Sequence, residues 1–135
     1  MKEDLLQYAW QYRLYDVSRL LTVDGEPISV INVGDLNRDA GPDFFNVKVK
    51  IGGTIWAGNV EVHVTASDWY KHHHDEDPRY DSVVLHVVER SDMRIRRANG
   101  DVIPQLERLY WFHGSMRPAI VSCPRPPWSS PRRYP

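Results

Sequence analysis

The sequence predicts an α/β or α+β domain with a central mixed sheet and flanking helices. Three observations favour this class: an amphipathic helical pattern opens the chain, strands with alternating polar and apolar residues follow, and an almost continuously apolar strand comes after a second short helix. The 135 residues fit one domain, and 41% hydrophobic with 26% charged residues is usual for a globular protein. We expect a single domain over residues 1–107.

The predicted elements follow one another closely along the chain. The first helix, Lys2–Leu14, has apolar side chains at helical spacing, with Glu3 and Asp4 in the first turn, where the helix dipole favours them. The later predictions are short strands at 20–23 and 28–33, a hairpin at 44–64, a short helix at 67–74, a strand at 82–89 buried on both faces, and a hairpin at 95–106 around Asn99-Gly100.

The turn of the first hairpin sets its predicted register. Gly52-Gly53 is a dipeptide that two-residue turns with positive φ prefer. Pairing Ile51 with Thr54 and counting back places Phe44 opposite Glu61 and Asn46 opposite Asn59. One face then carries Asn46, Lys48, Glu61 and His63, and the other carries the valines, Phe45 and Trp56.

The last part of the chain has a different composition. Residues 108–135 are punctuated by prolines and show neither a helical nor a strand period, which predicts an extended or disordered tail. Leu109, Tyr110, Trp111 and Phe112 offer the alternative of one more packed segment. If this ending is a truncation of a longer protein, these residues face solvent and favour self-association.

Charge and cysteine content limit the classes of function. A formal net charge of −1 argues against the broad basic surface of a dedicated nucleic-acid-binding module, although a local basic patch leaves nucleic acid open as a partner. The single Cys123 cannot form an intramolecular disulfide, and no apolar run is long enough to cross a bilayer. We expect a cytoplasmic protein without a membrane partner.

Residue types that bind metals or move protons gather between positions 43 and 86. They are Asp43, Glu61, His63, Asp68, His72, His74, Asp77 and His86. His72 and His74 would point in nearly opposite directions on a helix and together only on an extended chain. Oxygen-rich sites suit Mg or Mn, whereas several imidazoles suit Zn, Fe or Ni, so this mixed set leaves the metal open.

Each candidate also has a purely structural interpretation. Glu61 and His63 would then be solvated residues on a polar strand face, and His86 a core or cross-strand residue with one satisfied hydrogen bond. Asn37 would only build the loop before the hairpin, and Trp69 would be a packing residue.

Two resemblances extend this interpretation. The motifs GPDF, GNVEVHV, SDW, H-x-H, a later Asp and Tyr, and VVLHVV closely resemble a bacterial family of unknown function, common in Bacteroidetes, over about the first four fifths of the chain. The order Pro42-Asp43, then Glu61-Val62-His63 on the partner strand, with a helix before and after, resembles the restriction-endonuclease-like core of the PD-(D/E)XK nuclease superfamily. That resemblance implies that Asp43 and Glu61 hold a divalent metal. His63 occupies the place of the superfamily's lysine, and Lys48 on the neighbouring strand is the candidate for the missing amine.

The function expected from these patterns is metal-dependent hydrolysis of a phosphodiester. Asp43 and Glu61 are expected as ligands, His63 and Lys48 as groups that orient or deprotonate water, and His72, His74 and Asp77 as supporting groups or ligands of a second ion. Mg or Mn is the favoured metal and Zn the alternative. The rival function is a non-enzymatic metal-binding or interaction domain in which the histidines close a structural site.

Overall fold

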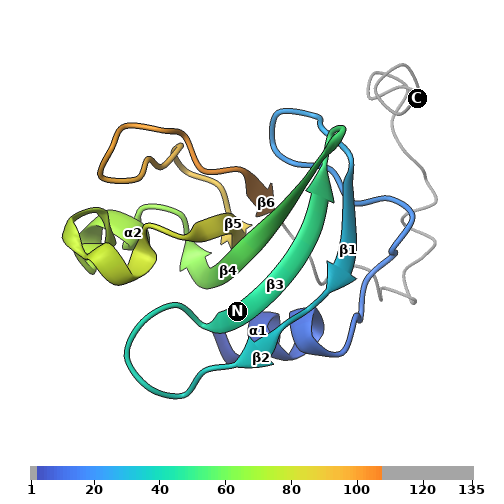
Figure 1. Ribbon diagram of the computed structural model, residues 1–135, viewed down its shortest axis with the longest axis horizontal. Coiled ribbons are helices and arrows are strands. Elements are labelled where there is room, and N and C mark those ends of the chain that lie inside the picture. The colour runs from blue at the N-terminus through green and yellow to red at the C-terminus, as the bar shows by residue number, and fades with distance from the viewer. Residues whose placement is uncertain (1–2, 108–135) are drawn as a thin grey trace.

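Six strands form one mixed sheet within residues 3–107, the part of the chain that the computed structural model describes (Figure 1). The strand order is β1 (Ile28–Asn32), β3 (Phe44–Ile51), β4 (Thr54–Thr65), β5 (Val83–Arg90) and β6 (Gln105–Glu107), and the short β2 (Asp35–Leu36) also pairs with β3. Pairing is antiparallel from β1 to β4 and parallel between β4, β5 and β6. This mixed sheet with helices confirms the predicted fold class.

Helices cover the sheet, and two buried clusters hold the layers together. From α1 (Glu3–Gln11), Leu6, Ala9 and Trp10 pack into the larger cluster, and the Trp10 indole donates to the Val33 carbonyl at 3.0 Å. The smaller cluster gathers around Trp69 in α2 (Asp68–Lys71), which lies near the ends of β4 and β5 in Figure 1. Two single-turn 3₁₀ helices follow, η1 (His74–Glu76) and η2 (Pro78–Tyr80). Strand β5 supplies residues to both clusters, which confirms that it is buried on both faces.

The register of the β3–β4 hairpin differs from the prediction by one residue. Ile51 pairs with Thr54 as predicted, and Gly52 has a φ of 63°. A β-bulge then shifts the pairing, so that Phe44 lies opposite Val60 instead of Glu61, and Asn46 leaves the ladder with a φ of 61°. An extra residue in one strand exchanges its two faces beyond the bulge. Phe44 is therefore the core residue, and the predicted Phe45 is 37% exposed.

Two further predictions about strands were wrong in part. The strand predicted at 20–23 is only an isolated bridge between Leu21 and Pro27, and the hairpin predicted at 95–106 is only an isolated bridge between Arg96 and Val102. The segment after that turn instead forms β6, which runs parallel to β5. This pairing satisfies backbone N–H and C=O groups on the edge of β5 that would otherwise have no partner strand. The predicted tail at 108–135, with its apolar residues at 109–112, lies outside the described residues. Among the residues described, none of the helices is long and apolar enough to cross a membrane.

Gly58 provides the close approach at which β4 meets the start of β5. A Cβ at this position would lie 2.4 Å from the Ser82 carbonyl oxygen and 2.6 Å from a methyl group of Val84. We predict that Gly58→Ala lowers the free energy of unfolding by about 2 kcal/mol, because the backbone must move. Gly53→Ala is the matched control, since nothing lies within 4 Å of its added Cβ. Equal urea midpoints for the two variants would contradict this account of the β4–β5 junction.

Glu3 places a partly buried carboxyl group at the start of α1. Burial, followed by the negative charges of Asp43 and Asp68, raises the pKa of Glu3 from 4.5 to about 7. Between these two pH values the folded chain binds more protons at Glu3 than the unfolded chain does. Stability is therefore lost as the pH rises from 4.5 through 7.

The variant Glu3→Gln removes this loss of stability at high pH. We predict that it is more stable than the wild type at pH 8, by about 1 kcal/mol after allowance for solvent screening, and nearly equal to it at pH 4. Urea unfolding at both pH values measures the difference. The same difference at pH 4 and pH 8 would show that the Glu3 carboxyl does not carry this penalty.

Candidate functional site

The loop before β3 holds Asp43 in place. The side-chain amide of Asn37 donates to the carbonyls of Asp39, Ala40 and Pro42 at 3.3, 3.1 and 2.9 Å. The Asn37 backbone N–H donates to the Asp43 carbonyl at 2.8 Å and closes the loop. These bonds confirm the loop-building interpretation of Asn37.

Asp43 and Glu61 lie together, as the sequence predicted, but the Asp43 carboxylate is occupied by the fold. Its Oδ1 accepts from the Gln7 side chain at 3.0 Å, and its Oδ2 accepts from the Val62 backbone N–H at 2.8 Å. The Asp43 backbone N–H donates in turn to Glu61 Oε1 at 3.1 Å. Burial raises the pKa of Asp43 above its usual value. Asp43 therefore ties α1, β3 and β4 together at the point where Glu61 is held.

Glu61 is the side chain at which the acidic and imidazole groups meet. Its Oε2 lies 3.2 Å from Nε2 of His63 and 3.1 Å from Nε2 of His74. Burial, with the nearby Asp43 carboxylate, raises the pKa of Glu61 to about 10, and burial lowers the pKa of His63 to about 2 and of His74 to about 4. A raised pKa for the carboxyl group and lowered pKa values for both imidazoles have the same consequence. In the absence of a cation, the proton at this contact belongs to Glu61, and His63 and His74 are neutral.

Three imidazoles beside Glu61 have the arrangement of a metal site. His63, His72 and His74 each offer a ligand atom, and these atoms lie within 4.8 Å of one another. The centroid of the His63 ring is 5.2 Å from each of the other two ring centroids. His63 is buried on β4, the His74 side chain is 10% exposed, and His72 is exposed. The cluster therefore lies partly beneath the surface and is reached from solvent on the His72 side.

A break in the helix lets His72 and His74 converge. Helix α2 ends at Lys71 with His72 as its C-cap, and His73 then adopts the left-handed conformation, with φ 60° and ψ 30°. This reversal brings His74 to the same side as His72, which a continuous helix would prevent. Tyr80 fixes the result by stacking on the His74 ring at 3.7 Å between centroids and an interplanar angle of 13°.

His86 and Gln105 continue the polar contacts into the sheet. His63 Nδ1 lies 2.7 Å from His86 Nε2, and His86 Nδ1 lies 2.9 Å from Gln105 Oε1. Burial lowers the pKa of His86 to about 4. His86 is thus a hydrogen-bonded core residue, as its structural interpretation predicted, and it also contacts the cluster.

Of the remaining predicted site residues, Lys48 lies apart from the cluster, whereas Asp77 is close enough for its charge to act on His74. Lys48 is exposed and pairs with Ala57, four residues before Glu61, which is about 13 Å along the strand. The Asp77 carboxylate forms an ion pair with Arg79 at 2.6 Å. Hydrogen bonds from the Arg79 side chain and backbone N–H lower the pKa of Asp77 to about 2. The structure therefore does not bring Lys48 or the Asp77 carboxylate into contact with the three imidazoles.

Three residues that build this region, Gln7, Tyr80 and Gln105, were not predicted as site residues. Gln105 fell within the hairpin predicted at 95–106. Gln105 reaches His86 only because β6 pairs directly with β5, with these two residues in register. A parallel pairing of strands separated by a long turn leaves no local pattern that would have revealed it.

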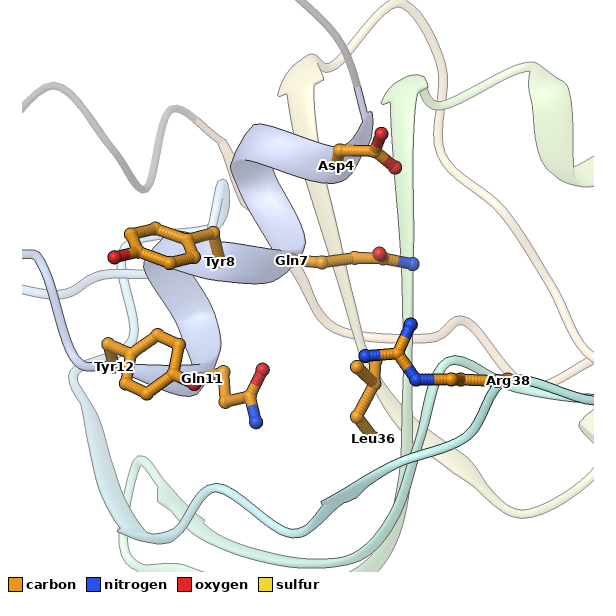
Figure 2. A pocket seen from close by; sticks show the side chains of 7 residues that line it. All are labelled: Asp4, Gln7, Tyr8, Gln11, Tyr12, Leu36 and Arg38. Carbon is orange, nitrogen blue, oxygen red and sulfur yellow. The ribbon is translucent and has the colours of Figure 1, made fainter.

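A surface groove lies on the other side of the Gln7 contact. Its walls are formed by α1 with the following Tyr12 and by β2 with the segment after it, and in Figure 2 Arg38 reaches across toward Gln7 and Gln11. The lining residues are Asp4, Gln7, Tyr8, Gln11, Tyr12, Leu36 and Arg38. Gln7 both lines this groove and donates to the Asp43 carboxylate, and the Asp43 backbone N–H donates to Glu61, so two hydrogen bonds connect the groove to Glu61.

Comparison with known proteins identifies the family but no activity. Neither the curated proteins nor the solved structures gave a significant match. Residues 3–116 match the family described as Protein of unknown function (DUF2851), and this match covers the sheet, both helices and the whole histidine cluster. The chain therefore belongs to the DUF2851 family of proteins of unknown function.

Proposed function

We propose that this domain binds one divalent transition-metal ion through His63, His72 and His74 and uses it to hydrolyse phosphodiesters. The observation that carries the proposal is the convergence of three imidazole ligand atoms within 4.8 Å, beside a buried carboxyl group. Such a donor set on a strand, a helix cap and a 3₁₀ turn has no need of a fourth protein ligand to hold an ion.

The donor atoms favour a borderline metal over a hard one. Imidazole nitrogen suits Zn, Fe, Ni and Cu, whereas Mg and Mn prefer carboxylate, carbonyl and water oxygens. The Asp43 oxygens, which the sequence analysis favoured as hard ligands, already accept two hydrogen bonds. We therefore propose Zn, or a metal of similar preference, as the ion and assign Asp43 the role of positioning Glu61.

The chemistry proposed for the ion and Glu61 is activation of water. An ion with three imidazole ligands keeps a position for water, whose pKa it lowers toward 7. The positive charge of an ion held by the three histidines would lower the pKa of the adjacent Glu61, whose carboxylate would then accept the proton of the attacking water. His72 is exposed, which leaves a route for water and substrate to this position.

The phosphodiester substrate is proposed from the order of the residues and from nearby charge. Asp43 precedes one strand of the hairpin, and Glu61 and His63 lie on its partner, which is the arrangement behind the nuclease resemblance. Lys48 and Lys50 are exposed along the same hairpin. We propose that they contact phosphates of a nucleic acid at a distance from the reacting bond, since positive side chains on a groove or strand supply most non-specific affinity.

The second candidate is a closed, non-enzymatic metal site. Its specific support is the distance of Glu61 Oε2 from two imidazole nitrogens, 3.1 and 3.2 Å, which is short enough for Glu61 to become the fourth ligand after a small shift. In that case the ion would stabilise the turn at His72–His74 and leave no position for water.

Metal binding is predicted to depend on His72 and not on its neighbour His73. Isothermal titration with Zn should give about one ion per chain, and His72→Asn should weaken binding by at least tenfold, because one of three ligands is lost. His73→Asn is the matched control, since asparagine tolerates the left-handed conformation of this residue. Equal loss of affinity in both variants, or no binding by the wild type, would contradict the metal site.

Hydrolysis is predicted to require Glu61 while metal binding does not. With Zn bound, the protein should cleave bis(p-nitrophenyl) phosphate and single-stranded DNA or RNA, and Glu61→Gln should reduce kcat by about 100-fold or more with little change in Zn affinity. Cleavage rates and Zn titrations of both proteins measure this. Loss of Zn affinity in Glu61→Gln together with absence of cleavage by the wild type would favour the closed site instead.

A further inference from the structure

We infer that Gln105 and His86 form a positioning chain that holds His63 as the tautomer protonated on Nδ1, with the lone pair of Nε2 directed at the histidine cluster. The chain crosses three neighbouring strands, from β6 through β5 to β4. The role of this positioning chain in ligand binding rests on the metal site proposed above. The tautomer of His63 itself is a property of the metal-free protein.

The orientation of the Gln105 amide is fixed by a backbone carbonyl. Gln105 Nε2 lies 3.1 Å from the Met93 carbonyl oxygen and 2.7 Å from Ser91 Oγ. A carbonyl oxygen can only accept a hydrogen bond, so the NH₂ group of the amide must face Met93. Gln105 Oε1 consequently faces His86.

The tautomer of His86 follows from this orientation. Gln105 Oε1 can only accept, so Nδ1 of His86, at 2.9 Å, must carry the proton. His86 is completely buried, and its two ring nitrogens contact His63 and Gln105 instead of an acidic group, so its imidazole stays neutral. A neutral ring with a proton on Nδ1 has a bare Nε2, which can only accept.

The same reasoning passes to His63. Its Nδ1 lies 2.7 Å from the bare Nε2 of His86 and must therefore donate to it. A neutral His63 then has its lone pair on Nε2, the atom that lies 3.2 Å from Glu61 Oε2. This is the atom that a metal ion among His63, His72 and His74 would bind.

The opposite tautomer of His63 would be favoured only beside an ionised Glu61 carboxylate. A proton on His63 Nε2 could be donated to a Glu61 carboxylate, and that arrangement would block the nitrogen from a metal. It would, however, bring two lone pairs together at 2.7 Å unless His86 also changed tautomer, and His86 would then face Gln105 Oε1 with a bare nitrogen. Turning the amide to relieve that conflict would direct its oxygen at the Met93 carbonyl.

The Met93 carbonyl thus fixes the orientation of the Gln105 amide, and the hydrogen bonds through His86 fix which ring nitrogen of His63 is free to bind a metal. Buried groups pay a high cost when a hydrogen bond is left unmade, and His63, His86 and Gln105 are all at most 2% exposed. A ligand histidine whose other ring nitrogen is held in this way is oriented before the metal arrives.

The direct test is the tautomeric state of His63 and His86 in the metal-free protein. Long-range ¹H–¹⁵N correlation spectra at pH 7 should show both rings protonated on Nδ1 and bare on Nε2. In Gln105→Met, which keeps the volume of the side chain and removes the acceptor oxygen, we expect both rings to move away from this state. Zn affinity should fall by about 10- to 100-fold in the same variant.

Ser91→Ala is the matched control. It removes one contact of the Gln105 NH₂ group but leaves the Met93 carbonyl, so both tautomers and the Zn affinity should stay as in the wild type. A merely structural role for Gln105 would lower the unfolding temperature without changing the tautomers. His63 protonated on Nε2 in the wild type, or wild-type tautomers in Gln105→Met, would overturn the inference. If the tautomers are as inferred and the wild type does not bind Zn, the proposed metal site is wrong, but the inferred hydrogen bonds from Gln105 through His86 to His63 still stand.

Discussion

The burial of the Glu61 carboxyl group is the constraint on which the rest of the site depends. A carboxyl group removed from water needs partners for both oxygens, and here these come from three separate segments: the start of β3, strand β4 and the turn at η1. The one-residue shift at the bulge brings the Asp43 backbone level with Glu61, so an irregularity of the hairpin supplies the first partner. The histidines supply the second, and their own burial keeps them neutral.

The three histidines of the cluster come from two kinds of backbone, a regular strand and an irregular turn. His63 is fixed on β4, where it pairs with Val88 of β5, whereas His72 and His74 depend on the left-handed His73 and on the ring of Tyr80. Non-glycine residues in the left-handed conformation carry some strain, which persists only where the surrounding contacts compensate for it. An ion bound between the two segments would add such a contact and join the turn to the sheet.

The sequence predicted the sheet well, because alternation and apolar runs report directly on burial. The leading helix, the hairpin at Gly52-Gly53, the doubly buried β5 and the closeness of Asp43 to Glu61 all follow from local patterns. The bulge at Asn46 was not predicted, because asparagine's tolerance of positive φ and its low preference for strands do not by themselves show that a strand gains a residue. The same holds for β6 and Gln105, which depend on pairing across distant segments, and for the break at His73, without which His72 and His74 would diverge.

The central claim is that three imidazoles hold one ion, and X-ray absorption spectroscopy of the Zn-loaded protein tests it most directly. The account predicts an inner shell of nitrogen and oxygen atoms at about 2.0–2.1 Å, with the outer-shell scattering of three imidazole rings. The His72→Asn variant should lose the contribution of one ring, and His73→Asn should keep all three. A shell of oxygen atoms without imidazole scattering, or an identical spectrum for wild type and His72→Asn, would contradict the account.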